Sequence, residues 1–352
     1  MEHARYMQRC LQLARNGAGF TAPNPMVGAV LVQGERILAE GWHRAHGRAH
    51  AEVECLRAFG NSPVPPDAVM YVSLEPCSHT GLTPPCTDLL ITRGIRTAVI
   101  GCTDPDPRVA GRGIARLRGA GITVITDVLR DECRWVNRRF ITAQEEQRPY
   151  VILKWARTSD GFLDRHPRDG RGVQRISCFT TDVLVHHWRS EEHAILVGSR
   201  TVLNDNPHLG VRHVAGRQPL RVVLDRQGIT PPSSNVYNGN APTLLFTGKV
   251  RGLKGVEEVV IQPGASLLES MMAELHHRKI RSLLVEGGGE LLSHFIAEGL
   301  WDETREIVGE ALFLQGTPAP RLVQQPFDSF HSGMDRIHLF TRTAQPDPTW
   351  PW

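Results

Sequence analysis

Short apolar runs alternate with helix-like stretches along the chain, and this alternation restricts its fold more than any other feature. In the first part of the 352-residue sequence, we expect strands at 27–32, 37–42, 69–73, 97–102 and 122–125. Apolar residues at helical spacing predict a helix over residues 7–14, another that begins at His50, and others near 86–93, 112–119 and 130–143. Such alternation is typical of an α/β layer fold, in which strands lie buried between helices.

The same alternation resumes after a polar run at residues 144–149, where we place a domain boundary. Strands are expected there at 150–155, 194–197, 220–224, 243–246, 256–261, 282–285 and 336–341. Helical patterns lie between several of them, near 181–190, 266–278 and 290–298. The chain is therefore predicted to form two α/β domains, over 1–146 and 150–352.

Composition excludes several classes of protein. The 40 basic and 37 acidic residues leave a net charge of +3, whereas nucleic-acid binding needs clustered positive charge to release counterions. Seven cysteines are too few for a disulfide framework in so long a chain, and their odd number leaves one unpaired. No apolar run approaches the about 18 residues of a membrane helix. We expect a cytoplasmic protein without nucleic-acid or membrane partners.

His50 and Glu52 stand at a predicted helix start, and two Pro-Cys pairs that end at Cys77 and Cys86 follow downstream. Zinc takes about four tetrahedral ligands, and a catalytic zinc keeps one position for water, so one imidazole and two thiolates are a complete protein set. Both cysteines lie where chain turns feed a helix, whose positive end would favour thiolates. Glu52 is placed to pass protons from water to a leaving amine.

Two other interpretations of these residues are ordinary core positions and a closed structural zinc site. A single His-Ala-Glu or Pro-Cys segment would favour the first. Both Pro-Cys pairs in order, each at a strand-to-helix junction, favour a metal site. Three protein ligands rather than four favour catalysis over a structural role.

The zinc segments resemble the cytidine deaminase superfamily. Eight residues separate the two cysteines, whereas nucleic-acid and nucleoside deaminases usually have two. The segments 22–28, 41–43, 50–52 and 75–86 resemble the deaminase half of the bifunctional deaminase/reductase family of riboflavin biosynthesis. By this resemblance Asn24, His43 and His79 contact the pyrimidine or its ribosyl phosphate. The family usually has Lys or Arg at the position of Leu82, so a cation that could meet an anionic substrate is missing here.

A glycine turn, Gly287 to Gly289, lies between a predicted strand and a predicted helix in the second half. Glycines let a pyrophosphate approach backbone N–H groups at a helix start, although a tight structural turn needs the same residues. The segments 154–161, 194–198, 201–212, 223–225 and 286–288 resemble, in order, the reductase half of the same family. That half has a dihydrofolate reductase-like fold and uses NADPH, so the resemblance covers both halves.

The resemblance implies two sets of site residues in the second half. NADPH would be held by Arg157, Arg175, Thr201, Asp205, Arg226, Gly288, Gly289, Glu290, Leu291, Leu292, Ser293 and His294. The substrate would contact Val173, Arg189, Leu209, Arg212 and Glu286. Arg189 and Arg212 would form a fork for the ribosyl phosphate, because guanidinium binds phosphate bidentately. Arg226 would reach the 2′-phosphate of the cofactor, with a solvated surface charge as the alternative.

Lys154 is the single lysine among the first 248 residues, since the chain otherwise uses arginine for positive charge. A compact ammonium near a hydride-transfer site could orient the ribose carbonyl or supply a proton, which arginine would do poorly. A surface lysine is the alternative, and the family motif favours catalysis. Val173 and Arg175 stand where the family commonly has a small hydroxyl residue and tryptophan.

The resemblance thus implies an N-terminal cytidine deaminase-like α/β/α domain and a C-terminal dihydrofolate reductase-like α/β domain. The first would hold one Zn²⁺ and deaminate 2,5-diamino-6-ribosylamino-4(3H)-pyrimidinone 5′-phosphate. The second would use NADPH to reduce the ribosyl side chain to ribityl. We expect a homo-oligomer with this small-molecule substrate. Alternatives are a deaminase with a degenerate reductase domain, a nucleic-acid editing deaminase, and a zinc-stabilised scaffold.

Overall fold

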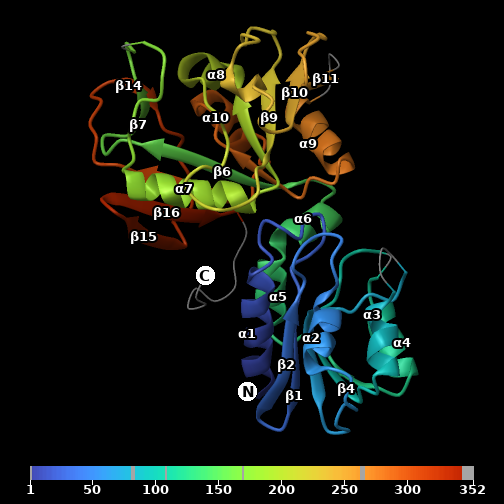
Figure 1. The fold of residues 1–352 in the computed structure, drawn as a ribbon. Helices are drawn as coiled ribbons and strands as arrows, with labels where there is room; N and C mark the ends of the chain where they lie inside the picture. The colour runs from blue at the N-terminus through green and yellow to red at the C-terminus, as the bar shows by residue number, and fades with distance from the viewer. Residues whose placement is uncertain (1, 81–83, 108, 169, 262–265, 343–352) are drawn as a thin grey trace. The chain divides into compact units, whose positions relative to one another are not determined.

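The structure, a computed structural model, describes residues 2–80, 84–107, 109–168, 170–261 and 266–342. It divides into two compact units between Gln147 and Arg148 (Figure 1). The division lies in the polar run at 144–149. Each unit is described by itself below.

The first unit contains a mixed five-stranded sheet in the order β2-β1-β3-β4-β5. Its strands are β1 (Gly28–Gln33), β2 (Arg36–Trp42), β3 (Val69–Leu74), β4 (Thr97–Cys102) and β5 (Thr123–Ile125). The first three strands pair antiparallel, and β3, β4 and β5 run parallel. The helices are α1 (Glu2–Arg15), α2 (Ala51–Phe59), α3 (Cys86–Thr92), α4 (Arg112–Gly119), α5 (Arg130–Val136) and α6 (Arg138–Glu145).

Helices cover both faces of this sheet (Figure 1). Alternate strand residues such as Leu31, Met70 and Ile100 form one buried cluster with side chains of α2, α3 and α4. The helix α1 packs on β1 and β3 and contacts α5. Gly41 allows the close approach of α2, because a Cβ at this position would lie 2.2 Å from the backbone nitrogen of Cys55. This packing holds the start of α2 against the sheet.

The second unit contains a nine-stranded sheet in the order β11-β10-β9-β8-β12-β6-β13-β16-β15. The strands from β11 to β13 run parallel, and β16 and β15 are antiparallel additions at one edge. Their bounds are β6 (Tyr150–Arg157), β8 (Ala194–Gly198), β9 (Leu220–Asp225), β10 (Thr243–Thr247), β11 (Glu257–Val260), β12 (Ser282–Val285), β13 (Glu303–Val308), β15 (Asp328–Ser332) and β16 (Asp335–Thr341). A separate ribbon pairs β7 (Phe162–Arg165) with β14 (Gly316–Pro318).

Apolar clusters lie on both faces of the parallel strands. One face packs against α9 (Leu267–His277) and α10 (Gly289–Ala297). The other includes residues near α8 (Ser199–Asp205) and the 3₁₀ helix η1 (Asn235–Tyr237). Val185 and Trp188 of α7 (Phe179–Glu191) pack on Ile307 and Ile337 of β13 and β16. Burial on both faces explains why most of these strands are continuous apolar runs.

The structure differs from the sequence expectations in two instructive places. The helix expected at 130–143 is two helices, because Asn137 interrupts it to exchange two hydrogen bonds with the backbone of Met26. The strand β13 was not expected, since charged residues are rare in central strands. There the buried Arg305 is paired with Glu303 at 2.7 Å and with Glu192 at 3.4 Å, so its charge is compensated inside the protein.

Candidate active sites

Three potential metal ligands converge in the first unit. His50 lies directly before α2, Cys77 lies in the loop after β3, and Cys86 begins α3. Their ligand atoms lie within 4.8 Å of one another. The Nδ1 atom of His50 is 3.7 Å from the Cys77 sulfur and 3.4 Å from the Cys86 sulfur. Only Cys86, therefore, has the helix-start position that was expected for both cysteines.

This donor set fits zinc. Tetrahedral coordination with ordinary Zn–S and Zn–N bonds separates a sulfur from a nitrogen ligand by about 3.6 Å, close to both separations found here. The backbone N–H of Cys86 also donates to the Cys77 sulfur at 3.4 Å. A hydrogen bond from the Cys86 thiol lowers the pKa of Cys77 to about 4. The same bond, together with burial, raises the pKa of Cys86 well above its usual range.

Glu52, His43 and Asn24 surround the metal cluster. Glu52 is 3% exposed, lies within hydrogen-bonding reach of Cys86, and has its pKa raised by burial. The His43 ring meets the His50 ring edge-on, with 5.3 Å between centroids. The Nδ1–H of His43 donates to the carbonyl of Ala49 at 3.0 Å, so its Nε2 accepts from the Asn24 amide at 3.3 Å. The structure thus brings three of the expected deaminase residues together.

The loop that carries Cys77 is held by a buried carboxylate that sequence reasoning did not assign a role. Glu75 accepts hydrogen bonds from the backbone N–H groups of Asp104, Gly111, Gly113 and Ile114, at 2.9–3.2 Å. The position of Glu75, two residues before Cys77, was the one sequence feature that could have indicated a role in holding this loop. His79 lies beyond Cys77, and its buried Nδ1 has no partner among the described residues. Leu82 lies outside the described residues.

A cavity of about 1280 Å³ lies in the second unit, where the parallel strands end at their carboxyl termini. Ligands of open α/β sheets bind at this edge. The following residues expected from the sequence line it: Lys154, Val173, Arg175, Arg189, Thr201, Asp205, Leu209, Arg212, Arg226, Glu286, Gly288, Gly289, Glu290, Leu291 and His294. The carboxyl ends of several parallel strands therefore converge on one site.

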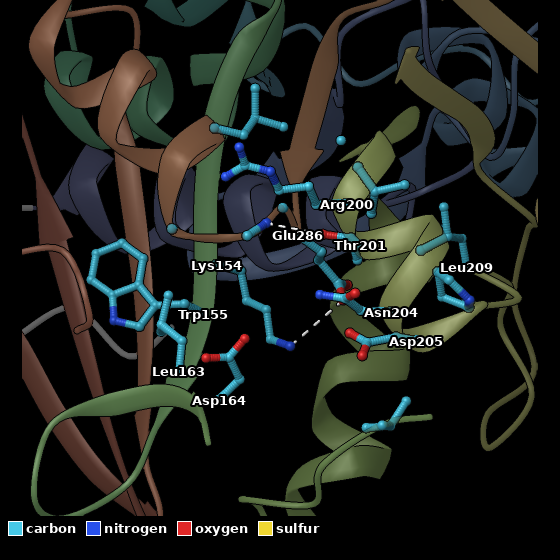
Figure 2. Close-up of a pocket in the computed structure, with 18 of the residues that line it drawn as sticks. Lys154, Trp155, Leu163, Asp164, Arg200, Thr201, Asn204, Asp205, Leu209 and Glu286 are labelled. Atoms are coloured by element: carbon cyan, nitrogen blue, oxygen red, sulfur yellow. Dashed lines mark hydrogen bonds and ion pairs between the residues drawn. The ribbon is translucent and has the colours of Figure 1, made fainter. Parts of the chain in front are cut away.

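Lys154, Arg189 and Glu286 form a charged centre in this cavity. The Lys154 ammonium, on β6, points toward the Glu286 carboxylate at 3.6 Å (Figure 2). Two nitrogens of Arg189 bind the same carboxylate at 2.7 Å each. Burial alone would raise the pKa of Glu286, but Arg189 and Lys154 outweigh it and lower that pKa to about 2. Glu286 is therefore an ionised, buried anchor for both cations.

The structure gives the two arginines of the expected phosphate fork different surroundings, and the fork itself stays a prediction. Arg189 already engages Glu286 through Nε and NH2, and its NH1 donates to the carbonyl of Gly210. Its side chain is only 12% exposed. Arg212, by contrast, is exposed, lines the cavity, and forms no salt bridge within the described part of the chain. The tertiary structure leaves Arg212 as the available guanidinium of the pair.

Several residues expected to bind the cofactor gather along α8 and the glycine turn. Thr201 accepts a hydrogen bond from the backbone N–H of Gly288 at 3.1 Å (Figure 2). Asp205 forms an ion pair with Arg168 at 2.7 Å, which sequence reasoning did not identify. Arg175 pairs with Asp182 at 2.8 Å. Exposed Arg226 follows the end of β9 at the cavity wall.

Three expected cofactor residues lie elsewhere. Arg157 binds Glu306 at 2.7 Å and lines a separate cavity of about 600 Å³. Leu292 is fully buried in the core. Ser293 is exposed on α10 and is not among the residues that line the larger cavity. Arg157 and Leu292 thus contact other parts of the second unit, and their expected role in cofactor binding stays a prediction.

Two protein families match the two halves of the chain. The RibD C-terminal domain matches residues 149–331, and the cytidine and deoxycytidylate deaminase zinc-binding region matches residues 1–102. The riboflavin biosynthesis protein RibD of Aquifex aeolicus is 39% identical over 320 residues, which cover 87% of this chain and 88% of that protein. The chain belongs to the RibD family.

Members of the RibD family match nearly the whole chain. The RibD protein of Bacillus amyloliquefaciens is 36% identical over 97% of this chain and 93% of its own length. The solved structure of a diaminohydroxyphosphoribosylaminopyrimidine deaminase/5-amino-6-(5-phosphoribosylamino)uracil reductase from Thermotoga maritima has a TM-score of 0.86 at 35% identity. It covers 97% of this chain, which in turn covers 98% of that structure.

Membership of the RibD family confirms the predicted fold class, a cytidine deaminase-like domain followed by a dihydrofolate reductase-like domain. The chain is a bifunctional deaminase/reductase of riboflavin biosynthesis, and the alternatives of an editing deaminase, a degenerate reductase and a scaffold are not favoured. No helix in the described ranges is both long and apolar enough to cross a membrane.

Proposed function

We propose that the first unit is a zinc-dependent deaminase acting on 2,5-diamino-6-ribosylamino-4(3H)-pyrimidinone 5′-phosphate. His50, Cys77 and Cys86 would hold the metal, and their mutual distances carry this proposal. Bound zinc would act as a Lewis acid that activates water for hydrolysis. Glu52, buried beside Cys86, would accept a proton from that water and return it to the leaving amine.

Asn24 and His43 would orient the pyrimidine in this site. Because the Nδ1–H of His43 donates to Ala49, its Nε2 accepts from the Asn24 amide and fixes the orientation of the Asn24 side chain. His79 has a buried ring nitrogen without a partner in the described chain, so it would meet a polar group of the substrate. We retain these three residues as substrate contacts.

We propose that the second unit is an NADPH-dependent reductase of the ribosyl side chain. NADPH would supply the hydride. Thr201, Asp205 and the glycine turn that begins α10 would hold the dinucleotide, whose pyrophosphate suits a helix start. Arg226 would contact the 2′-phosphate. Lys154 would hydrogen-bond the reacting ribose carbonyl and supply the proton that completes its reduction.

A coupled assay tests both halves on the full-length protein. Purified enzyme supplied with the pyrimidine phosphate and NADPH should release ammonia and then consume NADPH. Glu52→Gln should keep zinc but lower ammonia release by about 10²–10⁴-fold. Lys154→Met should lower NADPH oxidation with ammonia release unchanged. Normal turnover in either variant would remove that residue from its mechanism, and absence of both reactions in the wild type would refute the proposed substrate.

A homo-oligomeric state and a cytoplasmic location, expected from the sequence, also remain predictions. Light scattering on the purified chain would measure the first. Fractionation of the producing cells would measure the second.

A further inference from the structure

His186 of α7 is a buried histidine in the reductase cavity to which neither the sequence nor the proposed mechanism gave a role. It is 3% exposed, yet it lines the cavity together with Arg189 and Arg212. The ring of His213 meets it edge-on, with 4.4 Å between centroids. The side chain thus lies at the cavity wall, packed against the ring of His213.

The hydrogen bonds of His186 determine which ring nitrogen carries the proton. The backbone N–H of Arg212 donates to its Nδ1 at 2.9 Å, so Nδ1 is an acceptor. A neutral imidazole then bears its proton on Nε2. Burial, together with the positive charges of Arg189 and Arg212, lowers the pKa of His186 to about 4 and keeps the ring neutral. Within the described chain, Nε2–H has no hydrogen-bond partner.

The charges near His186 favour an anionic ligand. Arg189 is paired at 2.7 Å with Glu286, a carboxylate that it shares with Lys154. Asp182 is occupied by Arg175 and by the hydroxyl of Ser177. The guanidinium of Arg212 has no salt bridge in the part of the chain that the structure describes. It acts electrostatically on His186 and lines the same cavity, so the cavity holds both an unpaired positive charge and an N–H donor.

We propose that His186 is a substrate-binding residue whose Nε2–H donates a hydrogen bond to the phosphate monoester of the reductase substrate, beside the guanidinium of Arg212. This inference rests on the proposed reductase function. The Nδ1 of His186 thereby holds the backbone of Arg212, and its Nε2–H binds the phosphate that the Arg212 guanidinium also contacts.

Two substitutions separate these contributions. His186→Asn keeps an acceptor near the position of Nδ1 for the Arg212 backbone but removes the distal donor, whereas His186→Gln keeps a donor near the position of Nε2. His187→Asn is the matched control, because the neighbouring side chain is 58% exposed, faces Glu191 and does not line the cavity. Thermal midpoints would confirm that each variant is folded.

The readout is the KM for the phosphorylated reductase substrate compared with that for its dephosphorylated analogue, both followed by NADPH oxidation. We expect His186→Asn to raise the first KM about tenfold or more, the usual effect of a lost hydrogen bond to a charged group. Its kcat and the second KM should change less than about twofold, and His186→Gln should recover part of the loss. An unchanged ratio of the two KM values, or an equal rise in both, would overturn the proposal.

Direct titration with ribose 5-phosphate and with ribose distinguishes this inference from the proposed function. His186→Asn should weaken binding of ribose 5-phosphate about tenfold relative to the wild type and to His187→Asn, and leave ribose unaffected. Equal affinities for ribose 5-phosphate would refute the role of His186. A wild type that binds ribose 5-phosphate but does not oxidise NADPH would refute the proposed reaction and leave the phosphate contact supported.

Discussion

Replacing Glu286 by glutamine removes the charge that holds two buried cations. The pKa of Glu286 falls from an ordinary 4.5 to about 2 in the folded protein. Since a tenfold change in proton affinity corresponds to about 1.4 kcal/mol, the folded environment stabilises the ionised carboxylate by about 3 kcal/mol. Glu286→Gln should therefore destabilise the second unit by about 3 kcal/mol, a size typical for removal of one buried ion-pair partner.

Hydrogen exchange, measured peptide by peptide, would show which of the two units loses stability in Glu286→Gln. Amides of β6 and β12 should exchange about 100-fold faster in Glu286→Gln, while those of the first unit should not change. Glu290→Gln is the control, because Glu290 lies four residues away and pairs with Arg200 where both side chains are more than half exposed. An exposed pair contributes about 0–1 kcal/mol. Equal effects of the two substitutions would refute the argument from burial.

The contribution of Glu286 to the free energy of unfolding should decrease as the pH falls. The folded pKa of Glu286 lies below its unfolded value, so the contribution to stability is complete above about pH 4.5 and is lost as the pH falls toward about 2. The difference in unfolding free energy between the wild type and Glu286→Gln should shrink over that interval. A difference that grows on acidification would contradict the assignment.

Two further predictions concern the first unit. Cys86→Ser should lower zinc content and abolish ammonia release while NADPH oxidation on deaminated substrate continues; a parallel loss of both activities would show that the metal supports more than the deaminase. Gly113→Ala should lower the thermal midpoint of the protein and its zinc affinity, because the new Cβ would lie 2.1 Å from the carbonyl of Pro76 and overpacking costs about 1–3 kcal/mol. Gly119→Ala in the same helix meets nothing within 4 Å and should be neutral or stabilising by up to about 1 kcal/mol; equal losses would rule out the steric explanation.

Most strands could be predicted from the sequence because both sheets are buried on two faces. Residues 97–102 and 282–285 are apolar runs of this kind, and they became β4 and β12. The strand β13 could not be predicted, because Glu303, Arg305 and Glu306 make it polar. Its burial depends in part on contacts with distant segments, such as the one between Arg305 and Glu192, 113 positions away. The break at Asn137 has the same origin, since its partner Met26 is 111 positions distant.

The sequence by itself indicated the two-part organisation and three candidate metal ligands. His50 directly precedes α2, Cys77 follows β3 by three residues and Cys86 begins α3, so local motifs were enough to select the cluster that the structure brings together. The tertiary structure alone decided the ionic arrangement of the reductase cavity. Arg189 is committed to Glu286 and Arg212 is left available, because such pairings depend on distances between segments far apart in the chain, which no local periodicity records.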